Sequence, residues 1–386
     1  MKKEQTSIAF TGDIGFDKYM DRRWEDENLL SESVLSFLHS ADHVCANVEG
    51  ALTDGKDDGS LGVLFHSMNP EATCVLEKMG ADIWSLGNNH IMDAGERGIA
   101  DTLKLAAQLG RKTFGAGMDL AQASEPLYLE EAGGIGMIGV SYMAGCVPAT
   151  ETTPGILRWD DMDTIERRIK EIKEKCRWCI VVAHGGEEFS GLPLPYTRNR
   201  YLKYLDMGAD LVVGHHPHVP ENYELLPNGK AVFYSLGNFI FDTEYQRKHL
   251  YTDSGILLKL HFTTDNWDFE AVGIQIIRGA ERVNVAPTPD IFVNIPQAEY
   301  DLLAPLSAKA YLEEDKRIMR YLEPERFEGC SDDVWEHYFT KEISSYYSKD
   351  AHMDYGVIVP LAQKAEENLW QESRLDKVKD YILAQL

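Results

Sequence analysis

The first 250 residues alternate between short apolar stretches and longer amphipathic ones. Seven apolar stretches of strand length each end in polar residues, and they cover residues 7–13, 43–50, 82–90, 134–142, 178–186, 211–218 and 231–238. Helical spacing of apolar positions recurs between many of them, over residues 71–79, 95–109, 160–175 and 196–207. Strands that alternate with helices indicate an α/β layered fold. Because several strands are apolar on both faces, we expect helices to cover both sides.

The pattern changes after about residue 250. Three segments with apolar residues at every second position, "SGILLKLHF", "FEAVGIQIIR" and "RVNVAPT", predict an antiparallel meander. From about residue 296 the chain is charged and has helical spacing, as in "SAKAYLEEDKRIMRYLEPERF". We therefore predict a domain of residues 1–295 and a helical C-terminal extension of residues 296–386 packed on it. We expect the extension to expose its charges on solvated helix faces and to supply no metal ligand.

Composition narrows the classes of partner. Of the 386 residues 44% are hydrophobic, which is enough for a sizeable core, and the formal net charge is −25. Such an acidic chain argues against nucleic acid, because phosphate backbones require lysine and arginine patches. It also repels an anionic substrate, whether a small molecule or a polymer, over most of the surface. A bound metal could supply the local cation that such a substrate needs.

Apolar runs in this chain are too short for a membrane span. Stretches such as "CIVVA" and "GIGMIGV" fall far below the roughly 20 residues that a transmembrane helix needs. The N-terminal "MKKEQTSIAF" leads into a strand pattern rather than a signal-peptide core. We therefore expect a cytoplasmic protein, or an extracellular one whose leader has been removed.

Six cysteines are scattered without the regular spacing of a disulfide framework, which predicts reduced thiols. Cys176 and Cys179 form a C-x-x-C pair at a predicted helix end and inside a predicted strand. Without a second pair, simple burial is the favoured interpretation, and a zinc or redox role is the alternative.

Polar residues with metal-binding chemistry follow the predicted strands. They are Asp13, Asn47, Glu49, Asn88, Asn89, His90, His184, His215, His216, His218, Asn238 and Asp242. Each residue alone could be a turn cap or a hydrogen-bonded structural residue, but binding residues in open α/β sheets collect beyond the carboxyl ends of strands. Carboxylates, amide oxygens and imidazoles are ligands of Mn²⁺, Fe²⁺ and Zn²⁺. Their shared position favours a divalent metal site, and the absence of cysteine argues against structural zinc.

The stretch "LVVGHHPHV" places three histidines directly after a strand. In an extended segment residues two apart point to the same side, so His216 and His218 are expected to converge, with Pro217 stiffening the link. His215 is expected to face the other way and to pack or hydrogen-bond. Two imidazoles from one loop can reach two metals roughly 3.5–4 Å apart.

Several motifs, in order, resemble the bacterial capsule-synthesis protein CapA family. They are "GDI", "NVEG", "SLGNNHIMDAGERGIADTL", "AHGGEE", "GADLVVGHHPHV" and "YSLGNFIFD", over about residues 5–260. That family is associated with poly-γ-glutamate biosynthesis and belongs to the calcineurin-like metallophosphoesterase superfamily. The resemblance implies a four-layered α/β/β/α sandwich with metals at the strand ends.

Carried over residue by residue, the resemblance implies one or two divalent ions (Mn, Fe or Zn). The implied ligands are Asp13 and His218 on the first metal, Asn89, His184 and His216 on the second, and Glu49 as a bridging carboxylate. His90 would protonate a leaving group or steady charge in the transition state, and Asp93, at a helix start, would orient His90. The superfamily's D-x-H motif lacks its histidine here, because Ile14 and Gly15 follow Asp13. Its G-D-x-x-D motif is replaced by Asn-Val-Glu at residues 47–49, so the first metal would have fewer ligands.

Three functions remain open from the sequence. The first is a metal-dependent phosphoester hydrolase linked to poly-γ-glutamate capsule biosynthesis. The second is a metal-binding component of poly-γ-glutamate synthesis or export without hydrolytic activity. The third is a scaffold whose helical extension docks a partner, either a capsule-synthesis protein or a second copy of the chain.

Overall fold

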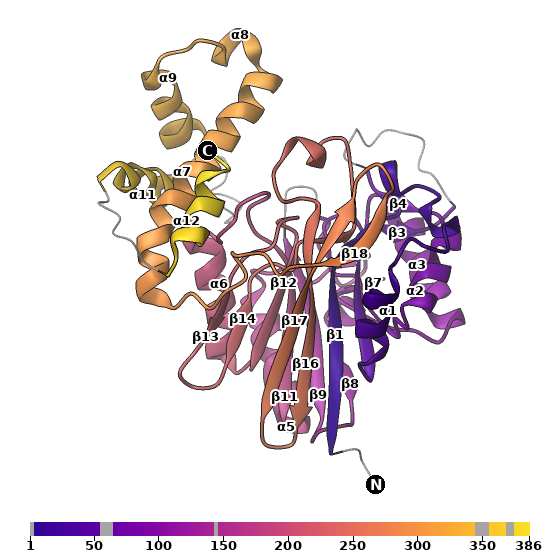
Figure 1. The fold of residues 1–386 in the computed structure, drawn as a ribbon. Helices are drawn as coiled ribbons and strands as arrows, with labels where there is room; N and C mark the ends of the chain where they lie inside the picture. The colour runs from indigo at the N-terminus through magenta and orange to yellow at the C-terminus, as the bar shows by residue number, and fades with distance from the viewer. Residues whose placement is uncertain (1–3, 55–64, 143–145, 344–354, 368–373) are drawn as a thin grey trace.

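A computed structural model describes residues 4–54, 65–142, 146–343, 355–367 and 374–386 (Figure 1). One sheet is built from β1 (Gln5–Ile14), β2 (His43–Val48), β5 (Ile83–Ser85), β6 (Lys112–Phe114), β15 (Asn238–Ile240), β16 (Ser254–Thr263), β17 (Trp267–Ile277) and β18 (Arg282–Ala286). Its order is β18-β17-β16-β1-β2-β5-β6, and β15 also pairs with β1. The β16–β18 meander is antiparallel, as predicted, and it extends the same sheet beyond β1.

The second sheet has the order β13-β14-β12-β11-β9-β8. Its strands are β8 (Leu127–Leu129), β9 (Ile135–Tyr142), β11 (Trp178–Gly185), β12 (Leu211–His215), β13 (Tyr223–Leu225) and β14 (Ala231–Phe233). Two short pairs lie apart from both sheets, β3 (Ala51–Leu52) with β4 (Ser67–Met68) and β7 (Ala116–Gly117) with β10 (Gly155–Ile156). In each large sheet the central strands run parallel, so their carboxyl ends share one edge.

Helices cover the outer face of each sheet. Those on the first sheet are α1 (Glu32–His39), α2 (Thr73–Lys78) and α3 (Gly95–Gln108), and those on the second are α5 (Met162–Lys175) and α6 (Pro195–Met207). A further short helix, α4 (Leu120–Ala123), follows β7. The amphipathic segments predicted to be helical are therefore helices, with ends that differ by a few residues.

Alternating side chains on the strands explain the layers. On β1, Ile8 and Phe10 enter the apolar cluster between the sheets, whereas Ala9 enters the cluster under α1–α3. On β11, Ile180 lies between the sheets and Val181 packs under α5 and α6. Burying an Ile, Val or Phe side chain in this way contributes about 1.5–3 kcal/mol. The fold is thus the predicted α/β/β/α sandwich, with strands that are apolar on both faces because both faces are covered.

Two predicted strands differ from the structure. The predicted strand 82–90 is a strand only over Ile83–Ser85, and the polar residues after it form a turn. The predicted strand 231–238 divides into β14 in the second sheet and β15 in the first, so the chain crosses between sheets there. Gly237 permits the crossing, because its φ is +66° and a Cβ would come within 2.8 Å of Pro220 and of the Ser254 carbonyl oxygen.

The extension is helical over its described residues, as predicted, while residues 344–354 and 368–373 of the expected helices lie outside the described part. Its helices are α7 (Gln297–Leu322), α8 (Pro324–Phe327), α9 (Asp332–His337), the π-helix η5 (Tyr338–Ile343), α11 (Tyr355–Glu367) and α12 (Asp376–Leu383). Helices α7 and α12 lie side by side (Figure 1), and both share an apolar cluster with Leu192 of the α/β part. Across the described ranges, the helices are all too short or too polar to cross a membrane. The six cysteines, which all lie in the described ranges, form no disulfide with one another, and Cys179 is buried in β11.

Candidate metal centre

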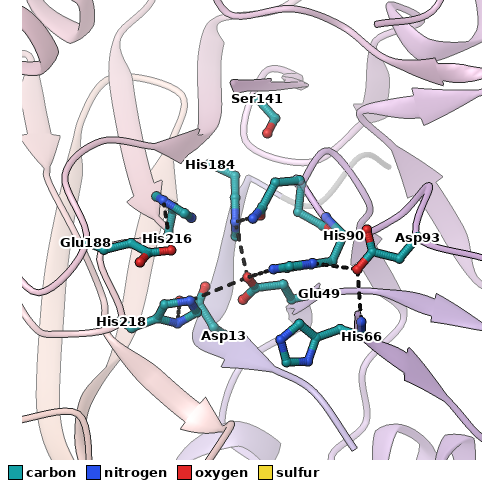
Figure 2. Close-up of polar contacts among 12 residues, drawn as sticks. Asp13, Glu49, His66, His90, Asp93, Ser141, His184, Glu188, His216 and His218 are labelled. Atoms are coloured by element: carbon teal, nitrogen blue, oxygen red, sulfur yellow. Dashed lines mark hydrogen bonds and ion pairs between the residues drawn. The ribbon is translucent and has the colours of Figure 1, made fainter. Parts of the chain in front are cut away.

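The candidate metal centre lies at the carboxyl ends of strands from both sheets (Figure 2). Asp13 is next to last in β1, and Glu49 follows β2 directly. The Glu49 backbone N–H donates to the Ile14 carbonyl oxygen at 2.9 Å, which continues the pairing of the two strands. His184 lies in β11, and His216 and His218 follow β12. The layered fold therefore brings residues from distant parts of the chain to one place.

Glu49 is at the middle of this cluster. Its Oε1 atom lies 3.5 Å from Nε2 of His184, 3.7 Å from Nε2 of His218 and 3.9 Å from Nε2 of His90. Both Glu49 carboxylate oxygens are buried, and neither has a hydrogen-bond partner among the described residues. A buried carboxylate without a partner is costly, and a divalent cation is a group that would satisfy it. The separations also suit metal–ligand bonds of about 2.0–2.2 Å on either side of an ion.

Asp13 and His218 lie side by side in the cluster, next to Glu49. Nδ1 of His218 lies 3.2 Å from Oδ2 of Asp13 and 2.9 Å from Oδ1 of Asn238. The Asn238 amide nitrogen already donates to Gln246 and to a backbone oxygen, so its Oδ1 atom accepts from His218. This partner orients the ring so that Nε2 faces Glu49, the arrangement that metal-binding histidines adopt. On the other side, Asn47 donates to Oδ1 of Asp13 at 2.8 Å.

The loop after β5 brings in Asn89. Its Oδ1 atom lies 2.9 Å from Nε2 of His184. Asn88 holds this loop, because its amide nitrogen donates to the Val48 carbonyl oxygen at 2.7 Å and its Oδ1 accepts from the His90 N–H at 3.1 Å. The two asparagines therefore act differently: Asn88 fixes the turn, and Asn89 points its oxygen toward the cluster.

Three sets of donor atoms lie close enough to share an ion, each within 4.8 Å. The sets are Asp13, Glu49 and His218; Glu49, His184 and His216; and Glu188, His216 and His218. All three sets come from the α/β part of the described chain, and none includes a described residue of the extension. These sets contain five of the six residues predicted as ligands. The sixth, Asn89, is in none of the sets, but its side-chain oxygen contacts His184.

Glu188 was not predicted from the sequence. Its Oε1 atom lies 3.9 Å from Nε2 of His216 (Figure 2). Glu188 follows β11 by three residues, after a turn in which Gly186 has a φ of +121°. The only signal for it was the second glutamate of the "AHGGEE" motif. Glu188 adds a carboxylate on the side of the site where His216 and His218 lie.

The missing D-x-H histidine has a steric explanation. The motif would place it at Gly15, where a Cβ would lie 2.7 Å from the ring of Phe241. That ring is itself 4.8 Å from the His218 ring, centroid to centroid. An aromatic side chain therefore fills the space that a histidine at this position would need.

His215 lies away from the cluster and its Nε2 atom is 2.9 Å from the Thr11 carbonyl oxygen. The physical reason that we gave for its orientation was wrong, however. The strand ends at His215, and His216 and His218 have φ values of +99° and +58°, so the segment is not extended. Left-handed conformations of non-glycine residues cost on the order of 1–3 kcal/mol each, and they cluster at functional sites.

His90 forms a dyad with Asp93. Nδ1 of His90 lies 2.7 Å from Oδ2 of Asp93, which comes just before α3. A second dyad that sequence analysis missed lies beside it, because Nδ1 of His66 is 2.7 Å from Oδ2 of Asp17. The two imidazole rings are 4.4 Å apart, and the His66 backbone N–H donates to Asp93 at 2.9 Å. His66 follows no predicted strand, so the strand-end pattern could not find it.

Burial and mutual charges move the pKa values of the cluster in opposite directions. Burial, followed by the charge of Asp13, raises the pKa of Glu49 well above its usual value. Burial would lower the pKa of His218, but Glu49 and Asp13 outweigh it and raise that pKa to about 10. Burial lowers the pKa of His184 well below its usual value. His184 is therefore a neutral imidazole ready to bind a metal, whereas His218 must lose a proton first.

The sheet order and the carboxylate and imidazole donors at the strand ends define an α/β/β/α sandwich with a candidate metal centre. The profile of the family described as bacterial capsule synthesis protein PGA_cap matches residues 7–243. The chain belongs to this family.

Named relatives agree with the family. The chain is 32% identical to the PGA biosynthesis protein CapA of Bacillus subtilis over 70% of this chain and 71% of the relative. It is 28% identical to the capsule biosynthesis protein CapA of Bacillus anthracis, over 67% of this chain and 64% of that protein. A probable polyglutamine synthesis accessory protein of Mycobacterium tuberculosis is 25% identical over 67% of this chain and 70% of its own. Among solved structures, the Thermus thermophilus protein TT1561 aligns with 69% of this chain and 98% of its own, with a TM-score of 0.38 and 13% identity, which is too distant to support an argument.

Proposed function

We propose that the chain is a metal-dependent phosphoester hydrolase that acts in poly-γ-glutamate capsule biosynthesis. The observation that carries this proposal is Glu49, whose two buried oxygens have no hydrogen-bond partner among the described residues. Three imidazole nitrogens surround it at 3.5–3.9 Å. His218 opposes only part of the cost of this burial, because the pKa of Glu49 stays well above its usual value, and a divalent cation would satisfy both oxygens.

Divalent ions would be held by the donor sets around Glu49. Asp13, Glu49 and His218 would hold one ion, and Glu49, His184 and His216 would hold another, with Asn89 beside His184. Glu188 would add a carboxylate beside His216 and His218. When bound, the ions would polarise phosphoryl oxygens and lower the pKa of a water molecule.

His90 is the proposed proton donor to the leaving group. Asp93 accepts from Nδ1 of His90, so the proton available for transfer is on Nε2, which faces Glu49 and the cluster. Burial lowers the pKa of His90, while the Asp93 carboxylate opposes this effect. His90 would therefore first take up a proton at Nε2, and the lowered pKa would make the resulting imidazolium a readier proton donor. The His66 N–H holds the same Asp93 oxygen and fixes the dyad.

Turnover of a simple phosphoester tests the proposal directly. Metal-free protein should be loaded with Mn²⁺, Fe²⁺ or Zn²⁺ and assayed with p-nitrophenyl phosphate and bis-p-nitrophenyl phosphate. We expect turnover that depends on the metal and disappears in Glu49→Gln. Absence of turnover in wild-type protein that holds metal would overturn the hydrolase proposal.

The names of the relatives favour a second candidate. The Bacillus proteins are named for PGA or capsule biosynthesis, and none of the names cited above describes a hydrolase. A metal centre without turnover could bind a poly-γ-glutamate chain by bridging its carboxylates to an acidic protein of net charge −25. Metal-dependent binding of poly-γ-glutamate by Glu49→Gln at wild-type strength would contradict this candidate.

A further inference from the structure

The end of the helical extension contacts the loop that carries Glu188. Gln385 follows α12, and its side-chain Oε1 accepts from the Gly191 N–H at 3.1 Å. Its Nε2 atom donates to the Phe189 carbonyl oxygen at 2.7 Å. The carbonyl oxygen of Gln385 accepts in turn from Arg317 of α7 at 2.6 Å. One amide therefore binds the backbone on both sides of Ser190, just after Glu188, and is itself fixed by a second helix.

Tyr381 of α12 contacts the loop after β11, which carries Glu188. It also contacts the loop after β12, which carries His216 and His218 and is called the histidine loop here. Its hydroxyl donates to the Pro220 carbonyl oxygen at 3.3 Å, two residues after His218. Its ring covers Gly191 so closely that a Cβ there would lie 2.7 Å from a ring carbon. It also stacks on Tyr251, which lies just before β16, with ring centroids 3.8 Å apart. Helix α12 thus reaches both loops that carry donors of one set.

Both loops adopt backbone conformations that need support. Phe189 has a φ of +59°, which is unfavourable for a residue with a side chain, and His216 and His218 are also in the left-handed region. The Phe189 N–H donates to the Pro217 carbonyl oxygen at 2.9 Å, so the two loops are coupled. The hydrogen bond from Gln385 to the Phe189 carbonyl oxygen therefore restrains both the backbone beside Glu188 and the histidine loop.

We propose that α12, through Gln385 and Tyr381, positions Glu188, His216 and His218 for metal binding. This inference rests on the proposed function, because it assumes that these three residues bind an ion. The described part of the helical extension then supplies no ligand but sets the metal affinity of the site, and it lies outside residues 7–243, which match the family. Gln385 is a positioning residue, and removing it would let the strained loop relax away from the ligand geometry.

Gln385→Ala tests the inference, with Leu386→Ala as the matched control one residue away and Tyr381→Phe as the variant that loses only a hydroxyl. Metal affinity should be measured by chelator competition at a temperature where circular dichroism shows each variant fully folded. We expect Gln385→Ala to bind Mn²⁺ or Zn²⁺ about 10–100-fold more weakly, the effect of losing a partner that orients a ligand. Tyr381→Phe should lose less, and Leu386→Ala should bind as the wild type does.

Hydrogen exchange of residues 186–192 in metal-free protein gives a second readout that does not depend on any ion. We expect the Gly191 amide to exchange faster in Gln385→Ala, while the melting temperature falls by no more than a few degrees. Wild-type metal affinity in Gln385→Ala would overturn the inference, and so would unchanged Gly191 exchange. If the wild-type protein itself binds no metal, the proposed function fails. The exchange data then still show whether Gln385 restrains the loop of residues 186–192.

Discussion

The candidate metal centre and the helical extension bury polar groups in opposite ways. The metal centre is called the rim of the α/β core below, and its residues are Asp13, Glu49, His184, Glu188, His216 and His218. At the rim, Glu49 is buried with no hydrogen-bond partner among the described residues, and its charge is opposed by Asp13 nearby. In the extension, Tyr300 donates to the Pro193 carbonyl oxygen at 2.9 Å, and Ser307 donates to the Leu192 carbonyl oxygen at 2.8 Å. A satisfied buried group stabilises slightly, whereas an unsatisfied one costs about 1–3 kcal/mol or more when charged.

This contrast indicates that the packing of the extension serves stability, whereas the arrangement of the rim serves binding. The extension packs aromatic rings closely, as in Phe327 and Trp335 with centroids 4.5 Å apart. The rim instead keeps two histidines in left-handed conformations next to carboxylates. Local violations of good packing and pairing mark functional sites, and their cost is met by the rest of the fold. Four changes can break or sharpen this comparison.

Glu49→Gln should have the largest effect on metal binding. It keeps the shape of the side chain but removes the charge, so affinity for divalent ions should fall by more than about 100-fold, beyond the loss expected from an orienting partner alone. The metal-free variant should melt at the wild-type temperature or higher, because burial and Asp13 disfavour ionised Glu49. Isothermal titration and thermal melts with and without metal check this. Glu174→Gln, at an exposed residue of α5, is the control, and a large drop in metal-free stability for Glu49→Gln would reverse the interpretation of the rim.

His90→Ala should separate catalysis from binding at the rim. Metal content should stay nearly unchanged, while phosphoester turnover falls roughly 10²–10⁴-fold, the range for a lost general acid–base group. Asp93→Asn should cost less, because it keeps the His90 ring and alters only the hydrogen bonds that Asp93 makes with His90 and with the His66 N–H. Metal analysis and turnover must come from the same samples. Full activity in metal-loaded His90→Ala would rule out the assignment.

Asp315→Asn should change stability in the extension as a function of pH. Burial raises the pKa of Asp315 to about 7 despite its hydrogen bond from Tyr355. The folded state therefore holds the proton more tightly than the unfolded state, so this stabilisation is present below about pH 3.8 and is lost as pH rises through about 7. The variant should melt a few degrees above the wild type at pH 8 and at the same temperature near pH 4. Equal melting temperatures at pH 8 would show that the carboxyl is solvated.

Ser307→Ala should have the smallest effect. It removes the bond to Leu192 and a contact of 3.1 Å with the Ser190 hydroxyl, which together are worth about 1 kcal/mol. Denaturant unfolding should show this loss while metal affinity stays at the wild-type value. A change in metal affinity would mean that α7 acts on the Glu188 loop through Ser190 as well as through Gln385.

Regular alternation made the layers and most of the rim predictable from sequence. Asp13, Glu49 and His184 end strands of the buried type, and parallel strands bring such ends together. Glu188 and His66 escaped because they lie on loops whose paths depend on glycine turns and on tertiary contacts. The split between β14 and β15 escaped for a similar reason, since the apolar run 231–238 reads as one strand until Gly237 turns it.

Anomalous X-ray scattering from crystals soaked in Mn²⁺ or Zn²⁺ tests the central claim most directly. Data collected on both sides of the metal edge locate the ions and identify the element. We expect peaks beside Glu49, within about 2.0–2.3 Å of its carboxylate and of the His184, His216 or His218 imidazoles. Well-ordered side chains with no anomalous peak at the cluster after soaking at millimolar metal would contradict the metal centre.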